Sequence, residues 1–185
     1  MKALRTSACQ ALPEWLSNAL PRIIIARMPS QPASQPSEFD AQRRRTQRDA
    51  AVAFFEAINA HDVERIVALL SADYEFVNSQ GDRFQGESFM RETWADQFNK
   101  HPDFRIRVGR VIADEEAVAM FGFSEGTYAP DGQLRSENRW SVPAAFLLMS
   151  REGKISYFES FSDASMVYDL IQASSASQGA AADED

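Results

Sequence analysis

The chain has 185 residues, of which 44% are hydrophobic, so it is long enough for one domain with a core of ordinary size. Its formal net charge is −8, and an acidic surface of this kind argues against nucleic acid as a partner. No apolar run reaches the roughly 18 residues typical of a membrane span, so we expect no membrane contact. The single cysteine, Cys9, allows no disulfide within the chain, and we expect a cytoplasmic protein.

The first 44 residues are expected to form a low-complexity extension that leads into the first helix. Proline, serine and glutamine dominate residues 29–36, a composition typical of a linker. The segment before the linker is basic, poor in acids and able to form a short amphipathic helix, as organelle transit peptides are. Residues 1–36 would therefore act as a targeting segment if the organism is eukaryotic, and a translation start at Met28 is a further alternative.

Three helices are predicted next, because apolar residues recur with helical spacing. The first is expected to begin at Ser37, where Ser-Glu-Phe-Asp offers a side-chain cap with an acid three residues on. Asp62 can cap the second helix, and Gly86 precedes the third. The predicted buried positions are Ala51, Phe54, Phe55 and Ile58 in the first helix, Val63, Ile66, Val67 and Leu70 in the second, and Met90, Trp94 and Phe98 in the third.

Strands are predicted where the apolar period falls to two. The first begins at Tyr74 and ends before a turn at Gly81 and Asp82, and the others follow as a meander. A last short helix is expected at residues 164–172, before a disordered acidic tail at residues 173–185. The predicted strands cover residues 74–79, 104–108, 118–127, 138–149 and 155–162.

Several stretches of the chain resemble one known family. The segment AINAHDVERIVALLSADYEFV, the glycine at position 86 and the short sequences HPDF and EGKI resemble the SnoaL-like branch of the nuclear transport factor 2-like superfamily, over about residues 45–172. The resemblance implies an α+β fold in which three N-terminal helices pack on the concave face of a strongly bent mixed β-sheet, a cone-shaped, cystatin-like α+β barrel. The inside of such a cone is a pocket suited to a hydrophobic small molecule.

The chain also resembles ketosteroid isomerase, but it lacks the catalytic groups of both relatives. The isomerase's helix tyrosine aligns with Phe54, its aspartate base with Asn78 and its oxyanion aspartate with Ala145. The aspartate base of the SnoaL cyclases aligns with Ser160. Asn78 cannot take up a proton at neutral pH, Phe54 and Ala145 cannot donate to an enolate oxygen, and a serine alone is a poor base, so catalysis by either mechanism is not expected.

Two classes of function therefore stay open. As an enzyme, the chain would be a cofactor-independent cyclase, isomerase or dehydratase of a polyketide-like or steroid-like substrate, and the candidate catalytic residues would be Asp163 and His101. As a non-catalytic protein, it would be a ligand-binding or dimerisation module. We expect no cofactor, and no spacing of ligand residues points to a metal site.

Alternation along the strands, with the register that the resemblance implies, predicts an aromatic pocket with neutral polar groups. Such walls suit a hydrophobic ligand of modest size that is held by a few hydrogen bonds. The residues predicted to contact the ligand are Phe54, Tyr74, Asn78, Trp94, Met120, Ala145, Phe158 and Ser160.

The opposite, convex face of the sheet is predicted to carry a large apolar patch. A monomer would expose this patch to water, which soluble monomers rarely tolerate. We expect a homodimer that pairs the two convex faces, with coverage by the N-terminal segment as the alternative. The residues assigned to the patch are Val77, Phe121, Phe123, Trp140, Val142, Phe146, Leu148, Tyr157 and Phe161.

Overall fold

The computed structural model describes residues 37–182, with side chains described as far as Ala173. Contacts divide the chain into two units, residues 1–35 and residues 36–185, and the described elements all belong to the second unit. The predicted linker, the transit-peptide and Met28 alternatives, and the last three residues of the tail lie outside the described residues.

Two of the N-terminal helices, α2 and α3, begin where a side chain caps them. In α2 (Glu38–Asn59), the Ser37 hydroxyl accepts from the Asp40 backbone N–H at 3.1 Å, and the Asp40 carboxylate accepts from the Ser37 N–H at 3.2 Å, which is the predicted capping box. In α3 (Val63–Ala68), the Asp62 carboxylate accepts from the Arg65 N–H at 2.9 Å, as predicted. Gly86 precedes α4 (Glu87–Lys100) with a positive φ of 98°, a conformation that glycine adopts without strain.

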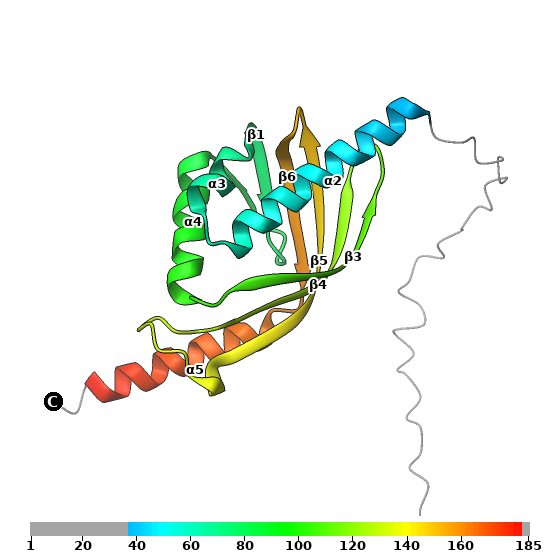
Figure 1. Ribbon diagram of the computed structural model, residues 1–185. Coiled ribbons are helices and arrows are strands. Elements are labelled where there is room, and N and C mark those ends of the chain that lie inside the picture. The colour runs from blue at the N-terminus through cyan, green and yellow to red at the C-terminus, as the bar shows by residue number, and fades with distance from the viewer. Residues whose placement is uncertain (1–36, 183–185) are drawn as a thin grey trace, which may run out of the picture. The chain divides into compact units, whose positions relative to one another are not determined.

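The strands form one six-stranded mixed sheet in the order β2-β1-β6-β5-β4-β3. Strands β1 and β6 are parallel, and all other neighbours are antiparallel. Figure 1 shows α2 crossing one face of the sheet, with α3 and α4 beside it, so the predicted α+β architecture is confirmed. The strands are β1 (Leu70–Val77), β2 (Arg83–Gln85), β3 (Arg105–Ala113), β4 (Val118–Thr127), β5 (Arg139–Arg151) and β6 (Lys154–Ser162), with a short 3-10 helix, η1 (Ser136–Asn138), before β5.

The core lies between the inner face of the sheet and the helices. Phe54 of α2 meets Phe158 of β6 edge to face, with ring centroids 5.3 Å apart, and Phe55 meets Phe146 of β5 in the same way at 5.1 Å. Met90, Trp94 and Phe98 of α4 are buried, as the every-fourth spacing predicts, and all belong to the same core cluster.

The side chains of β4 and β6 lie on the predicted faces of the sheet, but those of β5 lie on the opposite faces from the ones predicted. Directly opposed residues of antiparallel strands share a face, and Phe146 pairs with Met120 on one side and Ser160 on the other. Phe146 is therefore an inner residue, and Ala145 lies on the outer face, opposite Phe121 and Phe161. The other inner residues of β5 are Trp140, Val142, Ala144 and Leu148, all of them buried.

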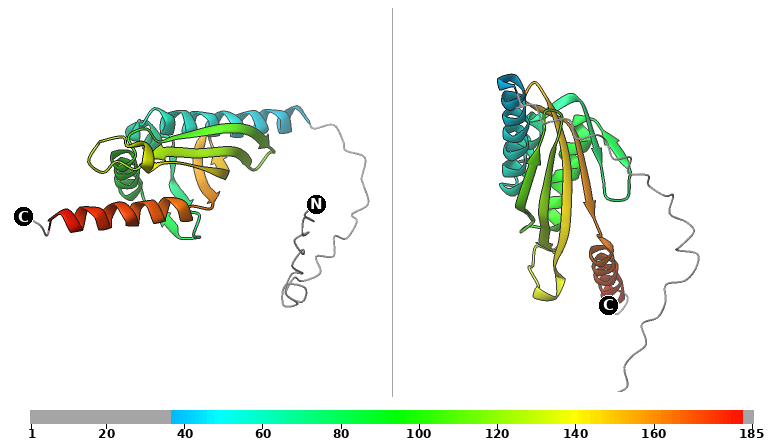
Figure 2. Two further views of the ribbon diagram at one scale, coloured as in Figure 1. Left: turned by 90° about the horizontal axis from the view of Figure 1, so that it is seen from below. Right: turned by 90° about the vertical axis from the view of Figure 1, so that its right-hand side faces the viewer.

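The C-terminal helix is longer than predicted. Helix α5 (Ser165–Ala182) continues past residue 172 into the segment that was expected to be disordered, and alanine, the best helix former, is abundant there. In the left view of Figure 2, α5 (orange to red) lies across the molecule from α2 (blue). Within residues 37–182, no helix has both the length and the apolar character needed to cross a membrane.

Candidate functional site

A cavity of about 300 Å³ lies between the inner face of the sheet, α4 and α5. Its walls are mainly aromatic and aliphatic, and none of the described residues that line it is Asp, Glu, Lys or Arg. The aromatic residues of the wall, apart from Tyr168, are Phe76, Trp94, Phe104, Trp140, Phe146 and Phe158. The polar residues are Thr93, Gln97, His101, Ser124, Ser160, Ser162 and Tyr168.

Regular spacing in two helices places their side chains in this wall. On α4, Met90, Trp94 and Gln97 recur at intervals of four and three residues, so they share one helix face. On α5, Val167 and Ile171 are four residues apart and line the cavity from the opposite side. No role in the pocket was predicted for α5, although the spacing of its apolar residues was a usable signal.

His101 follows α4 directly and is buried, with 4% of its surface exposed. The Lys100 carbonyl accepts from the Ala129 N–H at 2.8 Å, which ties this connection to the end of β4. Around the imidazole, the ring centroid of Trp140 lies at 5.5 Å and that of Tyr128 at 5.6 Å. Tertiary packing has therefore brought a loop histidine into the cavity wall.

The hydrogen bond of His101 fixes its tautomer. Nδ1 lies 3.3 Å from the Gln97 carbonyl oxygen, and because a carbonyl can only accept, we assign the proton to Nδ1. Burial lowers the pKa of His101 below its usual value, against the opposing effects of the Gln97 carbonyl, Asp103 and Asp96. The neutral ring then carries a lone pair on Nε2 that has no hydrogen-bond partner.

Four buried side-chain polar atoms in the described part of the chain have no hydrogen-bond partner. Three of them belong to residues that line the cavity: Nε1 of Trp94, Nε1 of Trp140 and Nε2 of His101. The fourth, the hydroxyl of Tyr74, belongs to a residue that does not line it, and burial raises the pKa of this phenol.

Four of the predicted site residues line the cavity: Trp94, Phe158, Ser160 and His101. Three others, Phe54, Tyr74 and Met120, lie in the core and are at most 4% exposed, but they do not line the cavity. They face the inside of the fold, as predicted, where neighbouring side chains fill the space.

Three predicted site residues lie away from the cavity. Ala145 lies on the outer face of the sheet, because the inner and outer residues of β5 are exchanged relative to the prediction. Asn78 follows the end of β1, and its side chain accepts from the N–H groups of Gln80 at 3.0 Å and Asp82 at 2.9 Å, so it closes the β1–β2 turn.

Asp163 is the third of these residues and is exposed. Its carboxylate accepts from the backbone N–H of Ser165 at 3.0 Å and from the Ser165 hydroxyl, and these bonds lower the pKa of Asp163. It therefore acts as a cap at the start of α5 rather than as a base inside the cavity.

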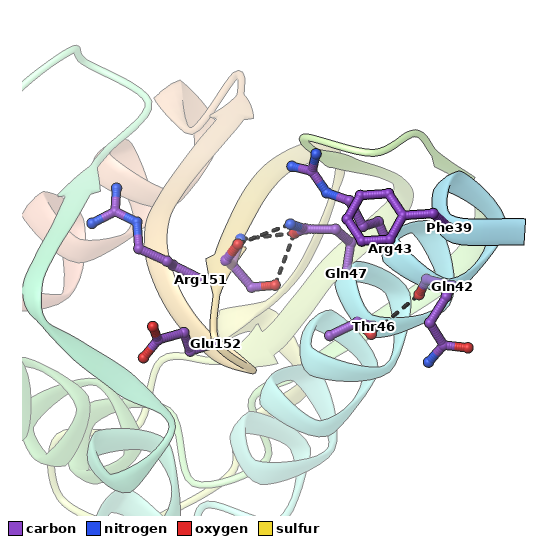
Figure 3. Close-up of a pocket in the computed structure, with 8 residues that line it drawn as sticks. Phe39, Gln42, Arg43, Thr46, Gln47, Arg151 and Glu152 are labelled. Carbon is purple, nitrogen blue, oxygen red and sulfur yellow. Dashed lines mark hydrogen bonds between the residues drawn. The ribbon is translucent and has the colours of Figure 1, made fainter. Parts of the chain in front are cut away.

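A second hollow, of about 250 Å³, lies between the start of α2 and the β5–β6 hairpin (Figure 3). Gln47 lines this hollow, but its side-chain oxygen and nitrogen both already form hydrogen bonds with Ser150. Phe39 stands at its rim with 70% of its surface exposed. Apart from Phe39, all the residues that line this hollow are polar or charged, so it suits an apolar ligand less well than the inner cavity does.

Two further kinds of site, a metal site and one built on the second imidazole, find no support among the described residues. Within residues 37–182, no three His, Cys, Asp or Glu side chains gather closely enough to hold a metal ion. Of the two imidazoles, His61 stacks on Phe98 with ring centroids 4.2 Å apart and donates through Nε2 to the Phe104 carbonyl at 2.7 Å. The inner cavity is therefore the candidate site.

Comparison with protein families gives one match, to the family described as SnoaL-like domain, over residues 51–158. A search of curated proteins finds no match.

Solved structures share the fold at low sequence identity. A candidate SnoaL-like polyketide cyclase from Jannaschia sp. CCS1 aligns with a TM-score of 0.61 and 15% identity over 75% of this chain and 96% of its own. An NTF2-like protein of unknown function from Cytophaga hutchinsonii aligns with a TM-score of 0.51 and 13% identity over 66% and 94%. A ketosteroid isomerase-like protein from Catenulispora acidiphila, in complex with trimethylamine, aligns with a TM-score of 0.53 and 17% identity over 61% and 84%.

Proposed function

The chain belongs to the SnoaL-like domain family, and from this premise we propose that it binds an apolar small molecule in the cavity between the sheet, α4 and α5. The observation that carries the proposal is the cavity itself, about 300 Å³ of space with largely aromatic walls and no charged side chain among its described lining residues. The trimethylamine complex of a ketosteroid isomerase-like relative supports the idea that this fold admits small molecules.

The size of the cavity limits the ligand. Pockets for small molecules span roughly 300–1,000 Å³, so this one lies at the lower end. A compact molecule of one to three rings would suit it better than an extended chain. Edge-to-face contacts with the surrounding rings favour an aromatic or cyclic ligand.

A variant that fills the cavity tests the proposal. Ser160→Leu adds apolar volume to the inner wall, whereas Ser141→Leu makes the same substitution on the outer face of β5. We expect mass spectrometry to detect a retained apolar molecule in the purified wild type and in Ser141→Leu, but much less in Ser160→Leu. Equal retention in the two variants would place the ligand elsewhere, and failure of the wild type to bind any apolar ring compound would refute the proposal.

A second candidate function is cofactor-independent proton transfer of the isomerase, cyclase or dehydratase type. The observation that favours it is that His101 lines the cavity with an unpartnered lone pair on Nε2, because a neutral imidazole can act as a general base. Asp163 caps a helix on the surface and is not proposed to take part. Turnover of an enolisable ketone that His101→Gln abolishes would support this function, and turnover that survives the change would exclude His101 as the base.

We also propose that two copies of the chain associate through the outer face of the sheet. Phe121, Phe123 and Phe161 are exposed there by 43%, 40% and 49%, and Ala145 pairs with Phe121 and Phe161 on either side. Contiguous exposed aromatic surface is uncommon on monomers. A second copy of the same face would bury it through a two-fold, self-complementary contact.

A further inference from the structure

Three arginines of α2 surround a hollow next to β3. Arg44, Arg45 and Arg48 line a space of about 230 Å³, and the rest of its described wall is Val111 and Ala113 of β3. Arg44 and Arg48 are four residues apart, and Arg45 and Arg48 three apart, so these side chains are neighbours on the helix surface. No acidic side chain is among the described residues that line this hollow.

The first of these arginines is held by the protein itself. Figure 1 shows the first turns of α2 beside the β3–β4 hairpin, and Arg44 Nε donates to the Glu115 carboxylate of this hairpin at 2.7 Å. The Asp114 carboxylate of the same turn accepts from the N–H groups of Glu116 and Ala117, both at 2.8 Å. The two acids nearest to Arg44 in this turn are therefore already bonded within the protein.

Arg45 and Arg48 have no such partner. Most arginines in residues 37–182 form an ion pair, but these two do not, although Asp49 follows Arg45 at a spacing that permits one. Like charges at helical spacing repel each other, which costs the helix some stability. The hollow thus presents two positive charges that no carboxylate of the described residues contacts.

A dianion with several oxygen atoms matches this arrangement. The guanidinium group carries its N–H donors in a planar fork, which binds carboxylate and phosphate oxygens in pairs. A phosphomonoester carries a charge of about −1.5 to −2 at pH 7 and has three acceptor oxygens, so one phosphate group can bind both arginines. A carboxylate carries a single charge and would leave the second arginine without a counter-charge.

The wall opposite the arginines adds an apolar contact. Val111 and Ala113 are partly buried and pack against the edge of the core, so their exposed parts form an apolar floor. A phosphate group alone makes no use of such a floor. A phosphomonoester with a small apolar substituent would cover it and remove apolar surface from water.

We propose that this hollow binds a small phosphomonoester. Its phosphate group accepts from the guanidinium groups of Arg45 and Arg48, and its apolar substituent contacts Val111 and Ala113. No residue lines both this hollow and the inner cavity, so the two sites can be tested independently.

Three anions separate the contributions of charge and apolar contact. Phenyl phosphate carries the dianion and a ring, inorganic phosphate carries the dianion alone, and benzenesulfonate carries the ring with one charge. Isothermal titration calorimetry of the full chain at pH 8, where both phosphates are largely dianionic, gives the dissociation constants. We expect phenyl phosphate to bind at least about fivefold more tightly than either of the others, and added sodium chloride to weaken its binding.

Variants that remove single charges locate the site. Arg45→Gln and Arg48→Gln are each expected to weaken the binding of phenyl phosphate about threefold to fivefold. Arg43→Gln is the matched control, because it removes the same charge from the same helix but lines the hollow beside the β5–β6 hairpin instead. Its effect should stay below about twofold. Glutamine is a good helix former, so all three variants should fold.

Several outcomes would overturn the proposal. Equal weakening by the three variants would show that binding follows net charge rather than this hollow, and no binding at about 10 mM phenyl phosphate would refute the site outright. Inorganic phosphate or benzenesulfonate binding as tightly as phenyl phosphate would refute the apolar contact or the need for a dianion. Ser160→Leu should leave the binding unchanged, and a loss in this variant would place phenyl phosphate in the inner cavity.

Discussion

Gln47 on α2 satisfies both backbone hydrogen-bonding groups of Ser150 on β5. Its side-chain nitrogen donates to the Ser150 carbonyl at 2.8 Å, and its oxygen accepts from the Ser150 N–H at 2.8 Å and from the Ser150 hydroxyl at 2.8 Å (Figure 3). The pairing of β5 with β6 shifts register between Met149 and Ser150, which interrupts the regular ladder at this point. The Gln47 side chain therefore supplies the backbone hydrogen bonds of Ser150 that a neighbouring strand would otherwise form.

Gln47→Ala is expected to lower the free energy of unfolding by roughly 2–4 kcal/mol, because the two backbone groups of Ser150 lose their partners in a partly buried position. Urea unfolding followed by circular dichroism measures the change. Gln42→Ala is the matched control, since Gln42 lies one turn earlier on α2 and is exposed. A Gln47→Ala variant as stable as the control would show that the bonds to Ser150 contribute little.

Gly122 of β4 is packed so closely against β3 that a Cβ at this position would overlap the carbonyl oxygen of Arg107. The contact lies beside the irregular register of β3 between Val108 and Arg110. Gly122→Ala must displace backbone rather than a flexible side chain, so we expect a loss of about 1–3 kcal/mol in the free energy of unfolding.

Gly109 provides the control for this substitution. A Cβ there would lie 3.6 Å from the Phe121 carbonyl oxygen, an ordinary van der Waals distance. Gly109→Ala should therefore be tolerated within about 0.5 kcal/mol in the same urea titration. Equal losses for the two glycines would contradict the close approach at Gly122 and point to a general intolerance of side chains in this part of the sheet.

The helices could be predicted because their signals are local. The capping box at Ser37 and the cap at Asp62 depend on residues three positions apart, and the apolar stripe of α4 repeats every fourth residue. Tertiary packing does not alter such patterns. Fold class and the number of N-terminal helices were therefore within reach of the sequence.

The faces of β5 could not be predicted in the same way. In the middle of β5 the inner residues alternate with Pro143, Ala145 and Leu147, so this part of the strand is apolar on both faces. Only Arg139 and Ser141, near its start, mark the outer face. The prediction relied on the resemblance to ketosteroid isomerase, which placed Ala145 inside. A shift of one residue moves every side chain of a strand to the other face.

The candidate site depended on contacts that the sequence does not display. His101 is buried because Trp140, whose face was assigned wrongly, and Tyr128 pack around it. Asn78 was predicted as an inner strand residue, but β1 ends at Val77 and the asparagine forms a turn. The strand-end prediction failed because Asn favours turns more strongly than it favours strands.

Association through the outer face predicts a dimer that a single charge disrupts. Sedimentation of the wild type at micromolar concentration is expected to show a dimer, and Phe161→Glu is expected to shift it to a monomer, because a carboxylate would lie in an apolar contact. Phe39→Glu is the matched control, since Phe39 is exposed on α2, which covers the opposite face of the sheet. A monomeric wild type would refute the proposed association.

Phe146→Glu should behave differently from Phe161→Glu. Phe146 was predicted to lie on the outer face, but it is 4% exposed and packs against Phe55 and Phe158 in the core. The substitution should therefore unfold the protein rather than dissociate it, and loss of the cooperative thermal transition would show this. A folded, monomeric Phe146→Glu would contradict the inner placement of residue 146.

Protonation of His101 predicts that the protein loses stability in mild acid. Well above pH of about 6.5, the imidazole is neutral in the folded and the unfolded chain. Because burial lowers the pKa of His101 in the folded protein, the unfolded chain takes up the proton first as the pH falls, and the free energy of unfolding decreases below pH of about 6.5. Carboxylates with lowered pKa values, such as Asp40 and Asp114, titrate at more acidic pH and contribute little in this window. Urea unfolding at pH 7.5, 6.5 and 5.5 measures the slope, which should be smaller in His101→Gln than in the wild type, and equal slopes would show that His101 accepts a proton as readily in its buried position as in the unfolded chain.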